Sequence, residues 1–280
     1  MRKELLLNKF DLFVTVGEYD FDIVEHTINF NKNKLDGLDN IFIFNENKNF
    51  NLKYATDIEK SFFPFTKEMI IEKTGMVERS GWIYGQMCNL YYSFLQQNKK
   101  YTLTIDSDVF FNKKINFFDS DIPIFTTSDE FHEPYFDHMK RLHPELVRSN
   151  RKSGISHHML FDKDVLTEIF SKVENFHNKP FYEVFLDEID NKEKSCCAEY
   201  EIYFHYVMNK YPEMYKLRDI KWGNFYNLSI KNFIKYDMVS LPHYLKTRPK
   251  DLFENILSFK FFRFFQTLKN AIYIKLFIRK

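Results

Sequence analysis

Two aspartates separated by one serine have the chemistry to hold a metal ion in this chain. Asp106 and Asp108, in YTLTIDSDVFF, directly follow an apolar run that predicts a β-strand. In open α/β sheets, ligands bind outside the carboxyl ends of the strands. Carboxylate oxygens suit Mg²⁺ or Mn²⁺, and such an ion keeps positions open for phosphate oxygens. We therefore predict that Asp106 and Asp108 bind a divalent cation and, through it, a diphosphate. The alternative is a solvated turn after the strand.

The same spacing occurs three more times, and local structure explains each instance. One pair precedes an apolar strand instead of following one. The other two pairs lie where helices begin, and acids there favour the helix dipole or cap the N-terminus. In that order, the pairs are Asp119 and Asp121, Asp20 and Asp22, and Asp162 and Asp164. Context therefore selects Asp106 and Asp108.

The elements expected around these aspartates alternate between strands and helices. Apolar runs at residues 10–16 and 40–46 flank a predicted helix at 19–34, which gives a β-α-β opening. A parallel pair of strands needs such a crossover. Downstream, helices are expected at 82–97, 163–176 and 197–211, and strands at 99–108, 122–127 and 153–162. This alternation predicts an α/β fold with a mainly parallel sheet flanked by helices.

Composition favours a folded protein and bounds its partners. A chain of 280 residues that is 44% hydrophobic can bury a full core, and few Gly and Pro beside 33 Phe speak against disorder. A net charge of +1 gives no argument for nucleic acid as a partner. Cys88, Cys196 and Cys197 form neither a disulfide framework nor a spaced zinc site, so a reducing cytoplasm is the expected compartment. No apolar run reaches about 18 residues, so we expect no ordinary membrane-spanning helix.

The C-terminal stretch differs in kind from the rest, so we divide the chain into a domain at 1–250 and a segment at 251–280. This segment is rich in Phe, Ile and Leu, and Glu254 is the single acid after Phe253. Its basic residues are Lys260, Arg263, Lys269, Lys275, Arg279 and Lys280. The pattern is typical of an amphipathic helix on an anionic membrane surface, which we expect residues 252–280 to contact. The alternative is a helix packed on the domain with its basic residues in water.

Five segments of the chain carry a resemblance to a known family. In order they are SGWIYGQMCNL, YTLTIDSDVFF, HEPYF, SGISHHMLFDKDVL and AEYEIYFHY. Together they resemble a family of poorly characterised bacterial and viral glycosyltransferases of the GT-A type, from surface-polysaccharide loci, over residues 10–245. A further segment, LPHYLKTRP, is loosely similar to the His-Tyr-x-Gly-x-x-Lys-Pro segment of glycosyltransferase family 8. Asn89 departs from the pattern, which has a basic residue after the Gly-Trp motif.

The resemblance implies roles for particular residues. Val14, Thr15 and Val16 would lie beside the nucleotide base and ribose, His243 would be a third metal ligand, and Lys246 or Arg248 would contact the diphosphate. The residues expected to bind donor or acceptor sugar are Trp82, Gln86, His132, Tyr135, His157 and His158. Successive side chains on a strand point to opposite faces, so at most one of the two adjacent histidines faces the cleft.

An acid at the start of helix 197–211 would deprotonate the acceptor hydroxyl if the reaction inverts configuration. Glu199 is the first candidate and Glu201 the second, and the two point in different directions on a helix. The alternative role of both is to favour the helix dipole.

These observations predict a metal-dependent glycosyltransferase of the hexosyltransferase type, with Mn²⁺ or Mg²⁺ as cofactor. It would move a sugar from a nucleotide-diphosphate sugar to a hydroxyl of a bacterial surface glycan or glycolipid, such as lipooligosaccharide or capsule. We expect it in the cytoplasm, peripheral on the inner face of the cytoplasmic membrane. One alternative is a nucleotidyltransferase or phosphotransferase that uses the paired Asp with Mg²⁺, although no Gly-rich phosphate loop is present in the sequence. A second is a non-catalytic membrane-binding module.

Overall fold

The computed structural model describes residues 8–95, 99–226 and 230–242. The predicted site residues His243, Lys246 and Arg248 and the C-terminal segment 251–280 lie outside this part, so their predicted roles stay predictions. Among the described helices, none combines the length and the apolar character needed to cross a membrane.

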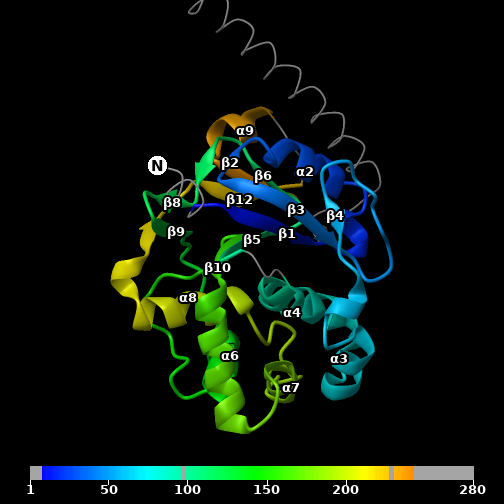
Figure 1. Ribbon diagram of the computed structural model, residues 1–280, viewed down its shortest axis with the longest axis vertical. Coiled ribbons are helices and arrows are strands. Elements are labelled where there is room, and N and C mark those ends of the chain that lie inside the picture. The colour runs from blue at the N-terminus through cyan, green and yellow to red at the C-terminus, as the bar shows by residue number, and fades with distance from the viewer. Residues whose placement is uncertain (1–7, 96–98, 227–229, 243–280) are drawn as a thin grey trace, which may run out of the picture.

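The centre of the molecule is a five-stranded sheet in the order β10-β5-β1-β3-β4 (Figure 1). β1 pairs in parallel with both β3 and β5, β3 pairs in parallel with β4, and β10 runs antiparallel to β5. The strands are β1 (Phe10–Thr15), β3 (Leu38–Phe44), β4 (Thr56–Asp57), β5 (Tyr101–Ile105) and β10 (His158–Asp162). The predicted β-α-β opening is therefore present, since β1 and β3 are parallel neighbours.

The remaining described strands form smaller sheets of mixed direction. One has the order β11-β9-β8, another β12-β13-β6, and a third pairs β2 with β7. Their bounds are β2 (Leu35–Asp36), β6 (Val109–Phe111), β7 (Ile115–Asn116), β8 (Phe118–Asp119), β9 (Ile122–Thr126), β11 (Lys216–Arg218), β12 (Trp222–Asn224) and β13 (Met238–Ser240). The α/β class is confirmed. The single mainly parallel sheet is not, because the smaller sheets contain antiparallel pairs, β6 with β13 and β8 with β9.

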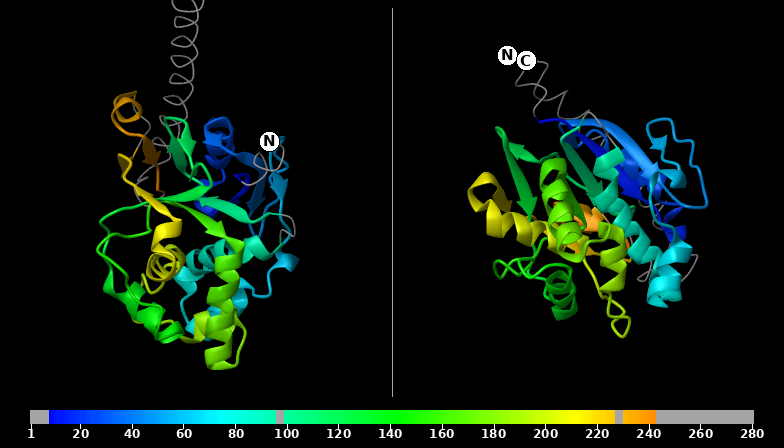
Figure 2. Two further views of the ribbon diagram at one scale, coloured as in Figure 1. Left: turned by 60° about the vertical axis from the view of Figure 1, so that its left-hand side comes forward. Right: turned by 60° about the horizontal axis from the view of Figure 1, so that its bottom comes forward.

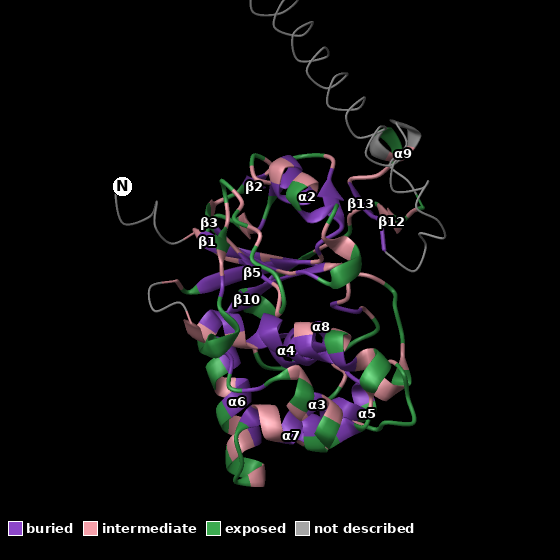
Figure 3. Ribbon diagram, turned by 90° about the vertical axis from the view of Figure 1, so that its right-hand side faces the viewer, coloured by how far each residue is buried: buried purple, intermediate pink, exposed green. Residues whose placement is uncertain are grey.

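Helices cover both faces of the central sheet. Figures 1 and 2 show α4, α6 and α8 together on one face, and Figure 3 shows α2 on the other. The helices are α2 (Val24–Asn31), α3 (Lys67–Thr74), α4 (Ser80–Leu95), α5 (Glu133–Leu142), α6 (Lys163–His177), α7 (Phe181–Asp187), α8 (Glu199–Lys210) and α9 (Ile230–Lys235). The helix predicted at 19–34 begins only at Val24, after a 3₁₀ turn at Glu18–Asp20.

The three strands β1, β5 and β10 are buried on both faces, as expected for the part of a sheet covered by helices on each side, whereas β3 and β4 at the other end have exposed residues. Phe13 of β1 packs in the cluster beneath α4 and α8, whereas Leu12 and Val14 pack in the cluster on the other face. Val14 is fully buried. Its side chain belongs to this core cluster, and its place beside the nucleotide, which the resemblance implies, stays a prediction.

Local contacts explain where the elements near the sheet begin. Asp162 caps α6, because its Oδ1 accepts a hydrogen bond from the backbone N of Asp164 at 2.9 Å, as predicted for this pair. The strand predicted at 153–162 begins only at His158, since His157 adopts a left-handed backbone with φ of +62°. This left-handed residue turns the chain just before β10.

Candidate functional site

Three parallel strands end side by side at one edge of the central sheet. Asp106 follows β5, Thr15 ends β1, and Asn45 follows β3. Because neighbouring strands lie about 4.8 Å apart, the residues after β5 and after β3 are separated by about 10 Å across this edge. In open α/β sheets this edge is where ligands bind.

Asp106 lies at this edge with its side chain 45% exposed. Its Oδ2 is 2.8 Å from Nδ1 of His157, and its backbone N donates to the His157 carbonyl at 3.0 Å. The His157 ring packs edge-on against Trp222 at 4.8 Å between centroids. Burial lowers the pKa of His157, but the hydrogen bond to Asp106 and the charges of Asp106 and Asp108 outweigh it, so the net shift is upward. The pair therefore favours an imidazolium beside a carboxylate.

Asp108 is buried and faces a different partner. Its Oδ1 accepts a hydrogen bond from the Ser240 hydroxyl at 3.2 Å, and its carbonyl accepts from the backbone N of Leu241 at 3.2 Å. Between the two aspartates, Ser107 donates from its hydroxyl to Oδ2 of Asp20 at 2.8 Å. Asp20, from another Asp-x-Asp triplet, therefore contacts the turn that carries Asp106 and Asp108. This contact was not predicted from the sequence.

The described residues contain no group of three His, Cys, Asp or Glu side chains arranged to hold a metal ion. The predicted third ligand, His243, lies outside them. The two carboxylates nevertheless fit a hard cation of the Mg²⁺ type, which takes one or two protein carboxylates and completes its shell with water and substrate phosphates. The half-exposed carboxylate of Asp106 is the group open to such an ion.

Glu199 is buried at the first turn of α8, close to the same edge. Its Oε1 accepts a hydrogen bond from Nδ2 of Asn89 at 2.9 Å, and its backbone N donates to Oε1 of Gln86 at 3.1 Å. Thr15, at the end of β1, donates to Oδ1 of Asn89 at 3.4 Å. Burial raises the pKa of Glu199 to about 7, against the hydrogen bond from Asn89, and the charge of Asp106 adds to the rise. This carboxyl group can exchange a proton near neutral pH.

Glu201 lies two residues further along α8 and is fully buried in a different environment. Its Oε1 accepts from the Ser153 hydroxyl at 2.7 Å, and its Oε2 accepts from the backbone N of Gly154 at 2.9 Å and lies 3.4 Å from Nε2 of His205. A Cβ on Gly154 would lie 2.5 Å from Cβ of Phe204. Glu201 therefore ties the segment before β10 to α8, and its contacts are those of a structural residue.

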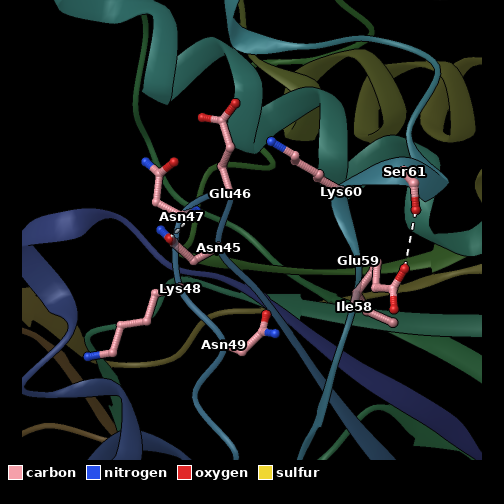
Figure 4. Close-up of a pocket in the computed structure, with 9 residues that line it drawn as sticks. All are labelled: Asn45, Glu46, Asn47, Lys48, Asn49, Ile58, Glu59, Lys60 and Ser61. Atoms are coloured by element: carbon pink, nitrogen blue, oxygen red, sulfur yellow. Dashed lines mark hydrogen bonds between the residues drawn. The ribbon is translucent and has the colours of Figure 1, made fainter.

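A groove of about 490 Å³ opens beyond β3 and β4 at the same edge. Figure 4 shows residues 45–49 on one side of it and residues 58–61 on the other. The lining side chains are Asn45, Glu46, Asn47, Lys48, Asn49, Ile58, Glu59, Lys60 and Ser61. Nδ2 of Asn45 donates to the Val16 carbonyl at 2.6 Å, which fixes the groove to the end of β1. This groove was not among the predicted sites, although a run of Asn and Lys at the end of a predicted strand marks it.

The other predicted binding residues have different surroundings. Thr15 and Gln86 lie beside Glu199 through the contacts above, and Trp82 packs under the guanidinium of Arg79 at 3.9 Å. His158 does not face the cleft: it is buried, with Nε2 2.9 Å from Oγ1 of Thr126, and burial lowers its pKa well below the ordinary value.

His132 and Tyr135 lie at the start of α5. Nε2 of His132 is 2.8 Å from the Ser195 carbonyl, and its ring packs against that of Tyr135 at 4.6 Å. Burial raises the pKa of Tyr135 to about 12, and the charges of Glu130 and Glu199 add to the rise. Both residues therefore lie at the border of the site, between the segment before α8 and the loop that contains Glu130. The carboxyl group of Glu130 was not among the predicted site residues.

Comparison with known proteins identifies no family. No protein-family model matches the chain, and no match is found among curated proteins. Among solved structures, the chain is similar to the apo form of mouse xyloside xylosyltransferase 1, at 11% sequence identity and a TM-score of 0.39, over 86% of this chain and 99% of the other. A TM-score at this level does not establish a shared fold.

Proposed function

We propose that this protein is a glycosyltransferase of the GT-A type that takes a nucleotide-diphosphate sugar as donor. The observation that carries the proposal is the edge of the central sheet, where Asp106 and the groove at 45–61 lie on either side of the end of β1. The span of about 10 Å between the ends of β5 and β3 suits a nucleoside diphosphate with its base in the groove and its phosphates at Asp106.

Asp106 and Asp108 would hold the divalent cation, Mn²⁺ or Mg²⁺. When bound, the ion would stabilise the negative charge that develops on the diphosphate leaving group. His157 keeps the Asp106 carboxylate in place through its 2.8 Å hydrogen bond, and Ser240 keeps that of Asp108 in place.

Glu199 would take the proton from the acceptor hydroxyl in a transfer that inverts configuration. Three features support this role: the pKa of about 7, the proximity to the charge of Asp106, and the hydrogen bond from the Asn89 side chain, which orients the carboxylate. A general base works best with a pKa close to the operating pH. Glu201 lacks this availability, because donors already surround both of its oxygens.

The finer parts of the proposal are the acceptor and the location. A hydroxyl of a bacterial surface glycan or glycolipid is supported by the resemblance of the sequence segments described above. A peripheral position on the cytoplasmic membrane is supported by the basic and aromatic composition of residues 252–280.

The test is calorimetric binding of a panel of nucleoside diphosphates, with and without Mn²⁺, to the wild type and to Asp106→Ala. We expect one nucleotide to bind in the presence of Mn²⁺ and to bind Asp106→Ala about a hundredfold more weakly, because the ion contributes several kcal/mol of charge stabilisation. Asp164→Ala is the matched control, since this Asp belongs to another Asp-x-Asp triplet and its side chain is 79% exposed.

Three results would count against the proposal. Equal binding by the wild type and Asp106→Ala would show that the nucleotide does not bind at this edge. Selective binding of a nucleoside triphosphate would favour the nucleotidyltransferase or phosphotransferase alternative. Absence of nucleotide binding together with binding to anionic vesicles would favour the membrane-binding module.

A further inference from the structure

The loop between β9 and α5, residues 127–132, exposes one aromatic ring beside the candidate site. The Phe131 side chain is 58% exposed. The ring nevertheless has a fixed support: it stacks on Phe136 at 5.5 Å and an interplanar angle of 25°, and the guanidinium of Arg148 lies 4.6 Å from its centroid. An exposed ring held on one side by packing presents its other surface as a rigid apolar plane.

Backbone and side-chain contacts fasten this loop to both parts of the site. At one end, Ser128 and Ser153 exchange two backbone hydrogen bonds of 3.0 Å, and the segment from Ser153 leads to His157 and its partner Asp106. At the other end, His132 contacts the Ser195 carbonyl, four residues before Glu199. The loop therefore spans the rim between the predicted metal carboxylate and the predicted base.

Glu130, directly before Phe131, carries a carboxyl group close to the charged residues of the site. Glu130 is exposed, but partial desolvation by its neighbours raises the pKa of its carboxyl group, the charge of Glu201 adds to the rise, and His157 and His132 lower it. These influences agree with the position of the loop between the His157 segment and α8. The backbone N of Glu130 donates to the Ser128 hydroxyl at 3.3 Å, which fixes the turn that carries it.

From this arrangement we infer that Phe131 is a stacking platform for a sugar ring of the acceptor, and that Glu130 binds hydroxyl groups of the same ring. A pyranose has a face of C–H groups that packs on an aromatic plane, and its edge carries hydroxyl donors that a carboxylate accepts. A protein partner would be met by several apolar side chains, whereas Phe131 is the only large exposed apolar residue of the loop 127–132, and Asp129 of the same loop forms an ion pair with Lys152. The inference rests on the proposed function, because it places the acceptor next to the donor edge.

The test uses defined sugars as probes: methyl β-D-glucopyranoside, methyl β-D-galactopyranoside and lactose, followed by saturation-transfer NMR. We expect at least one probe to bind the wild type and Phe131→Trp, and to bind Phe131→Ala about tenfold more weakly. Phe176→Ala is the matched control, because Phe176 on α6 is 56% exposed and its ring likewise packs on neighbours, His143 and His177. It should bind the probes like the wild type.

Several outcomes would overturn the inference. These are equal binding by Phe131→Ala and the wild type, equal loss in Phe176→Ala, and no saturation transfer from any probe to the wild type. Nucleotide titration of the same variants separates this failure from that of the proposed function. If a nucleotide binds all variants and no sugar binds, the role of Phe131 is wrong and the proposed function stands. If sugar binding depends on Phe131 and no nucleotide binds, the proposed glycosyltransferase function is wrong.

Discussion

Glu199 and Glu201 are both buried in the first turn of α8, but the groups around their carboxylates differ. Glu201 meets Ser153, Gly154 and His205, so that both of its oxygens have partners. Glu199 accepts a side-chain hydrogen bond from Asn89 and lies in the field of Asp106, and its pKa rises to about 7. One carboxylate holds the fold together, whereas the other is ready to exchange a proton.

This difference teaches that burial alone does not define a catalytic acid. Burial and the charge of Asp106 raise the pKa of Glu199 toward neutral pH, against the hydrogen bond from Asn89, whereas the contacts of Glu201 connect α8 to the segment before β10. The donors to Glu201 come from the segment before β10, and the donor to Glu199 comes from α4, more than 100 residues away. The surroundings therefore decide which of the two acids can act.

The largest effect is expected for Glu199→Gln. It removes the group that would accept the proton but keeps the shape and a partner for Asn89. We expect kcat to fall by about 10² to 10⁴, the range typical of general acid–base catalysis, with nucleotide binding unchanged. Initial rates at saturating donor and calorimetric nucleotide binding measure the two quantities. Unchanged kcat would exclude Glu199 as the base and leave a retaining transfer, which needs none.

The next effect is expected for Glu201→Ala, and it concerns stability. The substitution leaves the Ser153 hydroxyl and the Gly154 N–H buried without their acceptor, so we expect the free energy of unfolding to fall by about 3 kcal/mol. Urea denaturation should show a lower midpoint with an unchanged slope.

Glu213→Ala serves as the control, because Glu213 is exposed on a 3₁₀ turn and its loss should change stability by less than about 0.5 kcal/mol. If Glu201→Ala were as stable as the wild type but inactive, the roles of the two glutamates would be exchanged.

Much of the architecture could be predicted from local patterns. Short apolar runs located β1 and β5, and the spacing of apolar residues located α4, α6 and α8, because each element carries its signal within one stretch of sequence. The smaller sheets could not be predicted in this way. β6 has three residues and β7 has two, and their partners β13 and β2 are distant in the sequence. Such pairing depends on tertiary contacts that no short window contains.

The position of a site residue could be predicted where the residue follows a strand. It could not be predicted where the position depends on contacts with distant segments. The position of Asp106 after β5 came from the strand pattern, and the opposite orientation of Glu199 and Glu201 came from helix geometry. The burial of Val14, the contact of Ser107 with Asp20, and the groove at 45–61 arise from the packing of distant segments. Asn89 stood out only as a departure from the family pattern, and the structure places it on Glu199.

The smallest effect, and the sharpest test of the comparison, is expected for Asn89→Ala. Asn89 donates to Oε1 of Glu199 and so stabilises the charged carboxylate. Without this donor the pKa should rise above about 7, by about one unit for a lost bond of roughly 1.4 kcal/mol. A base acts when it is deprotonated, so the rising limb of the kcat profile against pH should move to more alkaline pH, while the plateau changes little. In Asn89→Asp a second negative charge should move the limb further in the same direction. A limb that stays in place in both variants would contradict the idea that the pKa of Glu199 controls the rate, because both changes act directly on that carboxyl group.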